Sequence, residues 1–259
     1  MKIFNHSIAL KICSLLSVVL ILNSCASKED ILYLNDVPNF ETIVADNTFS
    51  PKFKVDDEIS IFVSTFNKEA SEPFNLIKGA SEGGLRPEHV NYLIDENGEI
   101  DFPVIGKIKL VGLTAEEVRV LLRDKLKDYL VDPIINIRLE NFTITVLGEV
   151  NRPGTYPVIG EKVNIFEALG LAGDMRIKGV RKNVLVIRDF EGTKVHYRMD
   201  LTKKDVMESP AYYLTQNDVV YVEPNKSAVT SSSLDNRASI IVSILSVLIT
   251  SSVVLLTRS

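Results

Sequence analysis

Two charge-free apolar runs, one at each end of the chain, constrain this sequence more than any other feature. The first covers residues 12–27 and the second covers residues 238–257, whereas charged residues are spread through the sequence between them. With 46% hydrophobic and 24% charged residues, the chain has the composition of a globular protein. The central part is therefore expected to fold in water, and each end needs its own interpretation.

The N-terminal run is organised as a secretory signal. Lys2 and Lys11 lead into an apolar run that is too short to cross a bilayer comfortably, and the run ends in the sequence LNSC at residues 22–25. A small residue directly before a cysteine is what a lipoprotein signal peptidase requires. We therefore predict a signal peptide over residues 1–24 and a lipid on the Cys25 thiol, where each buried methylene contributes about 0.8 kcal/mol of membrane binding. An uncleaved anchor with a chance cysteine is the alternative.

Removal of the signal changes the properties of the remaining chain. It takes away two lysines and no acids, which moves the formal charge from −5 to −7, and it leaves Cys25 as the sole cysteine. Packing or assembly, rather than disulfides, must then stabilise the protein in an oxidising compartment. An acidic balance without a basic cluster also argues against a nucleic-acid partner.

The C-terminal run is long enough to span a membrane as a helix. Its 20 residues lie between Arg237 and Arg258, and at about 1.5 Å per residue they reach about 30 Å, the thickness of a hydrocarbon core. Hydroxyl residues recur along one face of such a helix: Ser239, Ser243, Ser246, Thr250 and Thr257. A stripe of small residues for helix packing within the membrane is one interpretation of this face.

Between the two runs, turn and cap signals predict two units of mixed strands and helices. The first unit comprises a strand after Asp56-Asp57, a hairpin over 92–104 that turns at Asn97-Gly98, a helix from Thr114 to about Tyr129, and a strand over 134–139. The second comprises strands over 143–150, 155–158, 184–188, 194–199 and 217–222, with a helix over 165–171 that Asn164 caps. Residues 25–51 are interpreted as a tether, and the serine-rich residues 225–236 as a linker.

Several motifs in this central part stand at recognisable spacings. In the first unit they are Asp95, Gly98, Phe102-Pro103, Ile105-Gly106, Val111-Gly112-Leu113-Thr114 and Asp132-Pro133. In the second unit they are Leu147-Gly148-Glu149-Val150, Arg152-Pro153-Gly154-Thr155-Tyr156, Ala168, Ala172-Gly173 and Val186-Ile187-Arg188. From about residue 52 to residue 222, the chain thus resembles the outer-membrane polysaccharide export family, the Wza-like capsule and exopolysaccharide translocon lipoproteins.

The resemblance implies an α+β fold with a defined order of parts. These are a lipoprotein signal peptide (1–24), a lipidated tether (25–51), a polysaccharide export domain (52–140), one β-grasp soluble-ligand-binding (SLBB) domain (141–224), a linker (225–236) and a transmembrane helix (237–258). It also implies a lipid-anchored outer-membrane protein, mostly periplasmic, that forms a homo-oligomeric ring and carries capsular or exopolysaccharide. An inner-membrane copolymerase or tyrosine-kinase-type partner is implied, and no cofactor besides the lipid on Cys25.

An oligomeric ring would explain the hydroxyl face of the terminal helix. A lone helix with such a face suits lipid poorly, whereas a ring of helices can turn the face toward a water-filled lumen. The five hydroxyl residues of the C-terminal run are therefore the lumen-lining candidates.

Departures from the family pattern bear on the fold. The glycine of a Gly-Asp turn is replaced at Asp56-Asp57 and at Asn217-Asp218, and the usual Ala-Gly-Gly ends in Asp174. Asn and Asp are the non-glycine residues that best tolerate a positive φ, so we expect these turns to keep their form. A single β-grasp unit, where the best-known members have two, implies a shorter periplasmic stack.

Catalysis is not expected from this sequence. His89 and His196 lie far apart in the chain, no free thiol remains after lipidation, and no cluster has metal-ligand spacing. We therefore predict no catalytic residue and no metal site.

The rival function is a lipid-anchored periplasmic ligand-binding or sensing module without a channel. Arg152 and Tyr156 are the candidate ligand contacts, and Tyr212 and Tyr213 could also stack on sugars. The terminal helix discriminates between the two functions, because a monomeric binding lipoprotein does not need a second membrane element.

Overall fold

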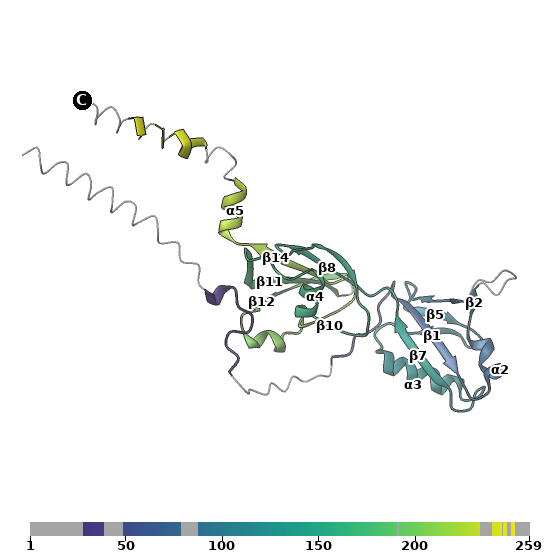
Figure 1. The fold of residues 1–259 in the computed structure, drawn as a ribbon. Helices are drawn as coiled ribbons and strands as arrows, with labels where there is room; N and C mark the ends of the chain where they lie inside the picture. Colours follow the sequence, from purple (N-terminus) through teal and green to yellow (C-terminus); the bar gives the residue numbers. More distant parts are fainter. Residues whose placement is uncertain are drawn as a thin grey trace, which may run out of the picture.

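The computed structural model describes residues 28–38, 49–78, 88–190, 192–233, 240–244, 246–247 and 250–251. These residues form two α+β domains that follow one another along the molecule, each around its own hydrophobic core (Figure 1). The predicted signal peptide, Cys25, Ser239 and Thr257 lie outside the described residues.

The first domain is a three-stranded antiparallel sheet with a helix on one face. The strand order is β4-β1-β7, made by β1 (Glu58–Ser64), β4 (Tyr92–Leu93) and β7 (Ile134–Leu139), and the helix is α3 (Ala115–Leu126). Alternate residues of the sheet and one face of the helix share a buried cluster, which includes Ile59, Ile61, Val63, Val118, Leu122, Leu126, Ile135 and Ile137. Short elements complete the domain: α2 (Lys68–Ser71), η2 (Glu72–Phe74), and the two-stranded pairs β2 (Ile77–Lys78) with β3 (Glu88–His89) and β5 (Glu99–Phe102) with β6 (Gly106–Lys109).

The helix of the first domain begins where its cap signal predicts. The Thr114 hydroxyl accepts the Glu117 N–H at 3.3 Å, and the Glu117 carboxylate accepts the Thr114 N–H at 2.7 Å, which makes a reciprocal capping box. The helix ends at Leu126, slightly before the expected Tyr129, and β7 covers residues 134–139 as expected.

The prediction of a hairpin over residues 92–104 is wrong, because its two strands do not pair with each other. The chain does turn at Asn97-Gly98, where Gly98 has φ 79° and the Asp95 carboxylate accepts the N–H groups of Asn97 and Glu99. The two arms then separate, because β4 pairs with β1 and β5 pairs with β6. A local turn signal was thus correct, while the pairing depended on distant strands that competed for the same edges.

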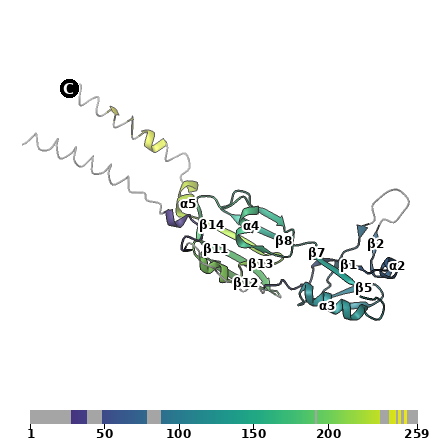
Figure 2. The ribbon, with the colours of Figure 1, turned by 60° about the horizontal axis from the view of Figure 1, so that its bottom comes forward.

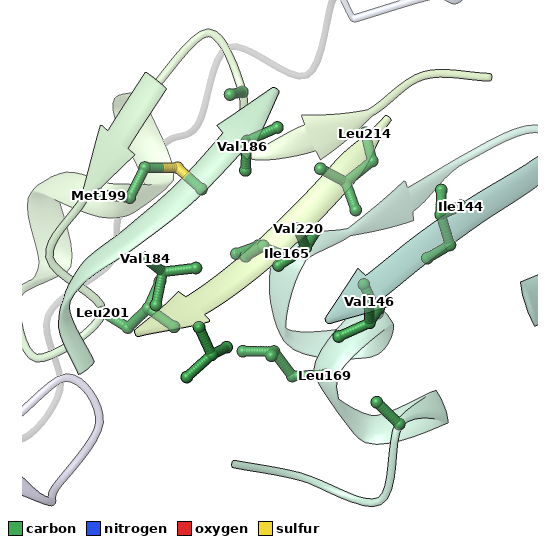
Figure 3. Close-up of a cluster of buried hydrophobic side chains, with 14 of the residues drawn as sticks. Ile144, Val146, Ile165, Leu169, Val184, Val186, Met199, Leu201, Leu214 and Val220 are labelled. Carbon is green, nitrogen blue, oxygen red and sulfur yellow. The ribbon is translucent and has the colours of Figure 1, made fainter. Parts of the chain in front are cut away.

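The second domain is a five-stranded mixed sheet with a short helix against it. The strand order is β12-β11-β14-β8-β9, and β14 is parallel to β8 while the other neighbours are antiparallel. The elements are β8 (Thr143–Gly148), β9 (Gly154–Pro157), β10 (Val163–Asn164), α4 (Ile165–Leu171), β11 (Gly179–Phe190), β12 (Thr193–Met199), η3 (Lys204–Glu208), β13 (Tyr213–Leu214) and β14 (Val219–Pro224). Figure 3 shows how Ile165 and Leu169 of α4 meet the side chains of β8, β11 and β14 in the core.

The three positions where Asn or Asp replaces a family glycine all have a positive φ. The values are 67° at Asp56, 65° at Asn217 and 72° at Asp174, which confirms that the turns keep their form. Two of these turns are alike. The Asp57 carboxylate accepts the N–H of Lys54 at 2.8 Å, and the Asp218 carboxylate accepts the N–H of Thr215 at the same distance, so each acid closes the turn that precedes its strand.

Both segments expected to be unstructured connectors contain structure. The linker includes the helix α5 (Lys226–Ser233), in which the Asn225 side chain caps the N–H of Ala228 at 2.9 Å and Lys178 of the second domain donates to the Ser231 hydroxyl at 2.9 Å. The tether includes the 3₁₀ turn η1 (Lys28–Asp30). Serine content alone therefore did not decide the conformation of the linker.

Among the described residues, we find no helical segment with the length and hydrophobicity that a membrane span needs. Of the run at 238–257, residues 240–244, 246–247 and 250–251 are described, and they are helical.

The Arg188–Asp218 ion pair is the buried charge pair of the second domain. Asp218 is fully buried and accepts from Arg188 Nε and Nη2 at 3.1 and 2.7 Å. We predict that Asp218→Asn lowers the free energy of unfolding by about 3–5 kcal/mol, because the Arg188 charge would stay buried without a counter-ion. Urea denaturation of the mature protein measures this, with Asp124→Asn at the exposed Lys127 pair as the control that should change little. Equal effects in both variants would contradict the assigned role.

Asp57, the counterpart of Asp218 in the first domain, should make the stability of the protein depend on pH. Burial raises the pKa of Asp57 from 3.8 to about 6, against the opposing hydrogen bond from Lys54. The native state then binds the proton more tightly, so the contribution of Asp57 to stability is complete below about pH 4 and is lost as the pH rises through 6. The free energy of unfolding of Asp57→Asn, relative to that of the wild type, should therefore increase by up to about 3 kcal/mol between pH 4 and pH 7, at 1.36 kcal/mol per pKa unit.

The control for this pH experiment is Asp56→Asn, at an exposed neighbour whose positive φ suits asparagine. Urea midpoints of both variants and the wild type should be compared across the pH range. A difference between Asp57→Asn and the wild type that does not change with pH would refute the prediction.

Candidate functional site

Both terminal segments leave the second domain at the same end. In Figures 1 and 2, η1 and α5 lie together at the end of the second domain that is away from the first domain. Lys28, at the start of η1, is three residues after Cys25, and α5 leads toward the apolar run at 238–257. We call this the terminal end of the second domain.

Residues 28–38, which we call the strap, are bound to the second domain rather than free. The Leu34 and Asn35 N–H groups donate to the carbonyls of Leu201 and Thr202 at 3.1 and 2.8 Å, and Asp30 pairs with Lys182 at 2.6 Å. The described part of the predicted tether is therefore a fixed segment. Its attachment places Lys28 at the terminal end.

Tyr33 is the strap's main side-chain contact. Its hydroxyl donates to the Asp174 carboxylate at 2.5 Å, and burial followed by this contact raises the pKa of Tyr33 well above its usual range. The ring lies 5.4 Å from the guanidinium of Arg181, which is itself buried and donates to the Gly179 carbonyl at 3.0 Å. The strap thus covers a buried cation, an arrangement in which aromatic faces are favourable partners.

Of the two predicted ligand contacts, Arg152 lies in the turn between β8 and β9, and Tyr156 lies on β9. Tyr156 donates its hydroxyl to the Arg152 carbonyl, while the Arg152 side chain donates to the Leu171 carbonyl at the end of α4 at 3.3 Å. The backbone N–H of Arg152 also donates to the Ala172 carbonyl at 2.8 Å. These contacts hold the turn against α4, and a role of Arg152 and Tyr156 in ligand binding stays a prediction.

Three of the predicted lumen-lining residues are described, and they lie on exposed helical segments. The Ser246 hydroxyl donates to the Ser243 carbonyl at 2.8 Å, and the Thr250 hydroxyl donates to the Ser246 carbonyl at 2.7 Å. Such bonds to the preceding turn satisfy the hydroxyl donors within the helix. The three residues therefore follow one face, as their spacing predicts, and what this face contacts stays a prediction.

Polar side chains join the two domains. The Lys54 ammonium, from the turn that leads into β1, donates to the Thr215 hydroxyl at 3.2 Å and to the Asp189 carbonyl at 3.5 Å. Burial lowers the pKa of Lys54, while Asp218 nearby opposes the shift. Gln216 binds both sides of the connection, since it donates to the Asn141 carbonyl and accepts the N–H of Thr143 at 2.7 Å. The junction is therefore a defined contact rather than a loose connection.

Among the described residues, no group of three or more His, Cys, Asp or Glu side chains could hold a metal ion. His89 packs its ring against Phe62 with centroids 4.8 Å apart, and His196 is exposed on β12. The absence of catalytic and metal sites stays a prediction.

Sequence reasoning missed the strap and the junction. Local patterns signal neither, because Tyr33 and Lys54 find their partners more than a hundred residues away. One local signal did point to the junction, namely the Gly-Asp-like turn at Asn217-Asp218. An acid that follows a positive-φ residue is placed to close the turn with its carboxylate, and this turn carries Thr215, the partner of Lys54.

Comparison with known proteins agrees with the two-domain division. A family model described as polysaccharide biosynthesis/export protein matches residues 47–140, and a model of the SLBB domain matches residues 143–198.

Two curated relatives carry the name EPS I polysaccharide export outer membrane protein EpsA. The one from Ralstonia solanacearum is 27% identical over 146 residues, which cover 55% of this chain and 38% of the relative. The one from Ralstonia nicotianae is 33% identical over 97 residues, which cover 36% of this chain and 25% of the relative. The matches thus span less than half of each relative's length. Residues 47–140 thus belong to the polysaccharide biosynthesis/export family, and an SLBB domain follows them.

Proposed function

We propose that this chain is an outer-membrane lipoprotein whose copies assemble into a ring that conducts capsular or exopolysaccharide across the outer membrane. The observation that carries the proposal is the common exit of the strap and α5 at the terminal end of the second domain. A lipid on Cys25 and a helix over 237–258 would then enter one membrane side by side. The first domain would project away from that membrane into the periplasm.

The names of the two relatives support the export role and the location in the outer membrane. Neither name specifies a channel or a lipid, so the ring and the anchor rest on this chain's own residues. The fixed strap supports a role for the lipid anchor in positioning the protein. A rigid attachment close to Cys25 would set the distance between the second domain and the membrane.

The hydroxyl face of the terminal helix supports a lumen. Ser246 and Thr250 donate their hydroxyls to the helix backbone, which leaves their oxygens able to accept from water. In a ring this face would line a hydrated path, and the isoleucines and leucines on the other faces would meet lipid and neighbouring helices. Conduction would be passive, driven by synthesis at the inner membrane through a copolymerase or tyrosine-kinase-type partner.

The proposal predicts that the two membrane attachments act separately. In a strain that lacks the native gene, Cys25→Ser should block lipidation and cleavage and lower surface polysaccharide. Deletion of residues 238–259 should abolish export while lipidation and the folded domains remain. Surface polysaccharide and membrane fractionation measure both variants. Export retained after the deletion would favour the ligand-binding module instead.

The orientation of the terminal helix predicts a pattern of thiol labelling. Because Cys25 would be blocked by its thioether, single cysteines can be introduced without background. Cysteines at Ser243, Ser246 and Thr250 should react with a membrane-impermeant thiol reagent in intact membranes, whereas a cysteine at Ile244 should not. A thiol in hydrocarbon has a raised pKa and no contact with the reagent. The reverse pattern would mean that the hydroxyl face packs against protein, and the lumen would have to be assigned elsewhere.

A further inference from the structure

Five aromatic rings form a continuous row on the second domain. In order they are Tyr33, Phe166, Tyr212, Tyr213 and Phe49, and successive ring centroids are 5.7, 6.3, 5.0 and 5.3 Å apart. All five side chains are half-buried, so each packs part of its ring and leaves part open to solvent. Three successive pairs meet edge to face, and Phe49 stacks on Tyr213. The buried parts of Tyr33, Phe166 and Tyr212 pack against the core of the second domain. We call these residues the aromatic row.

The aromatic row runs along the length of the second domain. Tyr33 belongs to the strap at the terminal end, whereas Phe49 lies shortly before Lys54, whose ammonium contacts Thr215 at the domain junction. α4 supplies Phe166, and the chain at the start of β13 supplies Tyr212 and Tyr213 (Figure 2). The row thus leads from the first domain toward the end where both terminal segments leave.

Charged and polar groups border the aromatic row. The Lys162 ammonium lies 5.9 Å from the centroid of the Tyr213 ring, and Glu167 is close enough to contribute to the raised pKa of Tyr212, whose largest cause is burial. Arg188 fixes the backbone here, since it donates to the Tyr213 carbonyl at 2.8 Å. The strand segment that carries Tyr213 is therefore positioned by the buried ion pair of Arg188 with Asp218.

This combination of groups suits one class of ligand. A sugar ring presents apolar C–H faces and a rim of hydroxyls, so it needs aromatic faces flanked by hydroxyl, carboxylate and ammonium groups. We propose that the aromatic row is a contact surface for a saccharide chain, which lies against the solvent-exposed parts of the rings. The inference rests on the proposed function, because it identifies where on the second domain the exported polymer makes contact.

Binding to full-length protein in detergent tests the proposal without requiring a channel. The probe is a set of oligosaccharides cut from the surface polysaccharide of the producing bacterium, and affinity is measured by calorimetry and saturation-transfer NMR. The double variant Tyr212→Leu, Tyr213→Leu should bind about tenfold more weakly, which corresponds to 1.4 kcal/mol. The matched variant Tyr212→Phe, Tyr213→Phe keeps both rings and should stay close to the wild type.

Two further controls keep the test decisive. Tyr129→Leu removes an exposed tyrosine of the first domain and should leave binding unchanged. In the unaltered protein, the oligosaccharides should protect Tyr212 and Tyr213, but not Tyr129, from nitration by tetranitromethane, which gives a result even if the leucine variant fails to fold. Absence of saturable binding by the wild type, or unprotected Tyr212 and Tyr213, overturns the proposal. Because export after deletion of residues 238–259 is measured separately, a failed channel and a failed binding surface are distinguishable.

Discussion

The carboxylate of Asp218 is the constraint on which the arrangement of this molecule depends. It is fully buried, and it accepts from Arg188 on β11 and from the backbone of Thr215 in the turn before β14. Thr215 in turn accepts from Lys54 of the first domain. A charge that is placed in a protein interior must keep all of its partners, because an unpaired one is strongly destabilising. The pair therefore connects the core of the second domain to the junction between domains.

This constraint extends to the surface and to the ends of the chain. Arg188 also binds the Tyr213 carbonyl, so the ion pair positions the strand that presents Tyr212 and Tyr213. Along the same domain, the strap is fixed by backbone hydrogen bonds and by the contact of Tyr33 with Asp174. In the ring that we propose, a second domain with one defined terminal end would let neighbouring copies place their membrane segments in register.

The sequence predicted those parts of the structure whose signals are local. The helices after Thr114 and Asn164 begin as their caps indicate, and Asp56, Asn217 and Asp174 adopt the positive φ expected of glycine replacements. The strand pairing near Asn97 and the helix α5 were missed, because both depend on partners in other elements. For the candidate site, the same limit applies. The sequence placed Arg152 in a turn and Tyr156 on the strand that follows it, as the structure has them. The strap and the order of rings in the aromatic row, however, arise from contacts across the fold.

The ring that we propose consists of identical subunits, and polysaccharide passes through it. The decisive experiment is electron microscopy of the full-length protein, extracted from membranes in mild detergent and sorted into class averages, because the images report assembly and symmetry together. We expect closed rings with one rotational symmetry, a central opening, and the second domains next to the detergent belt. Isolated two-domain particles across several mild detergents, with no rings, would contradict it.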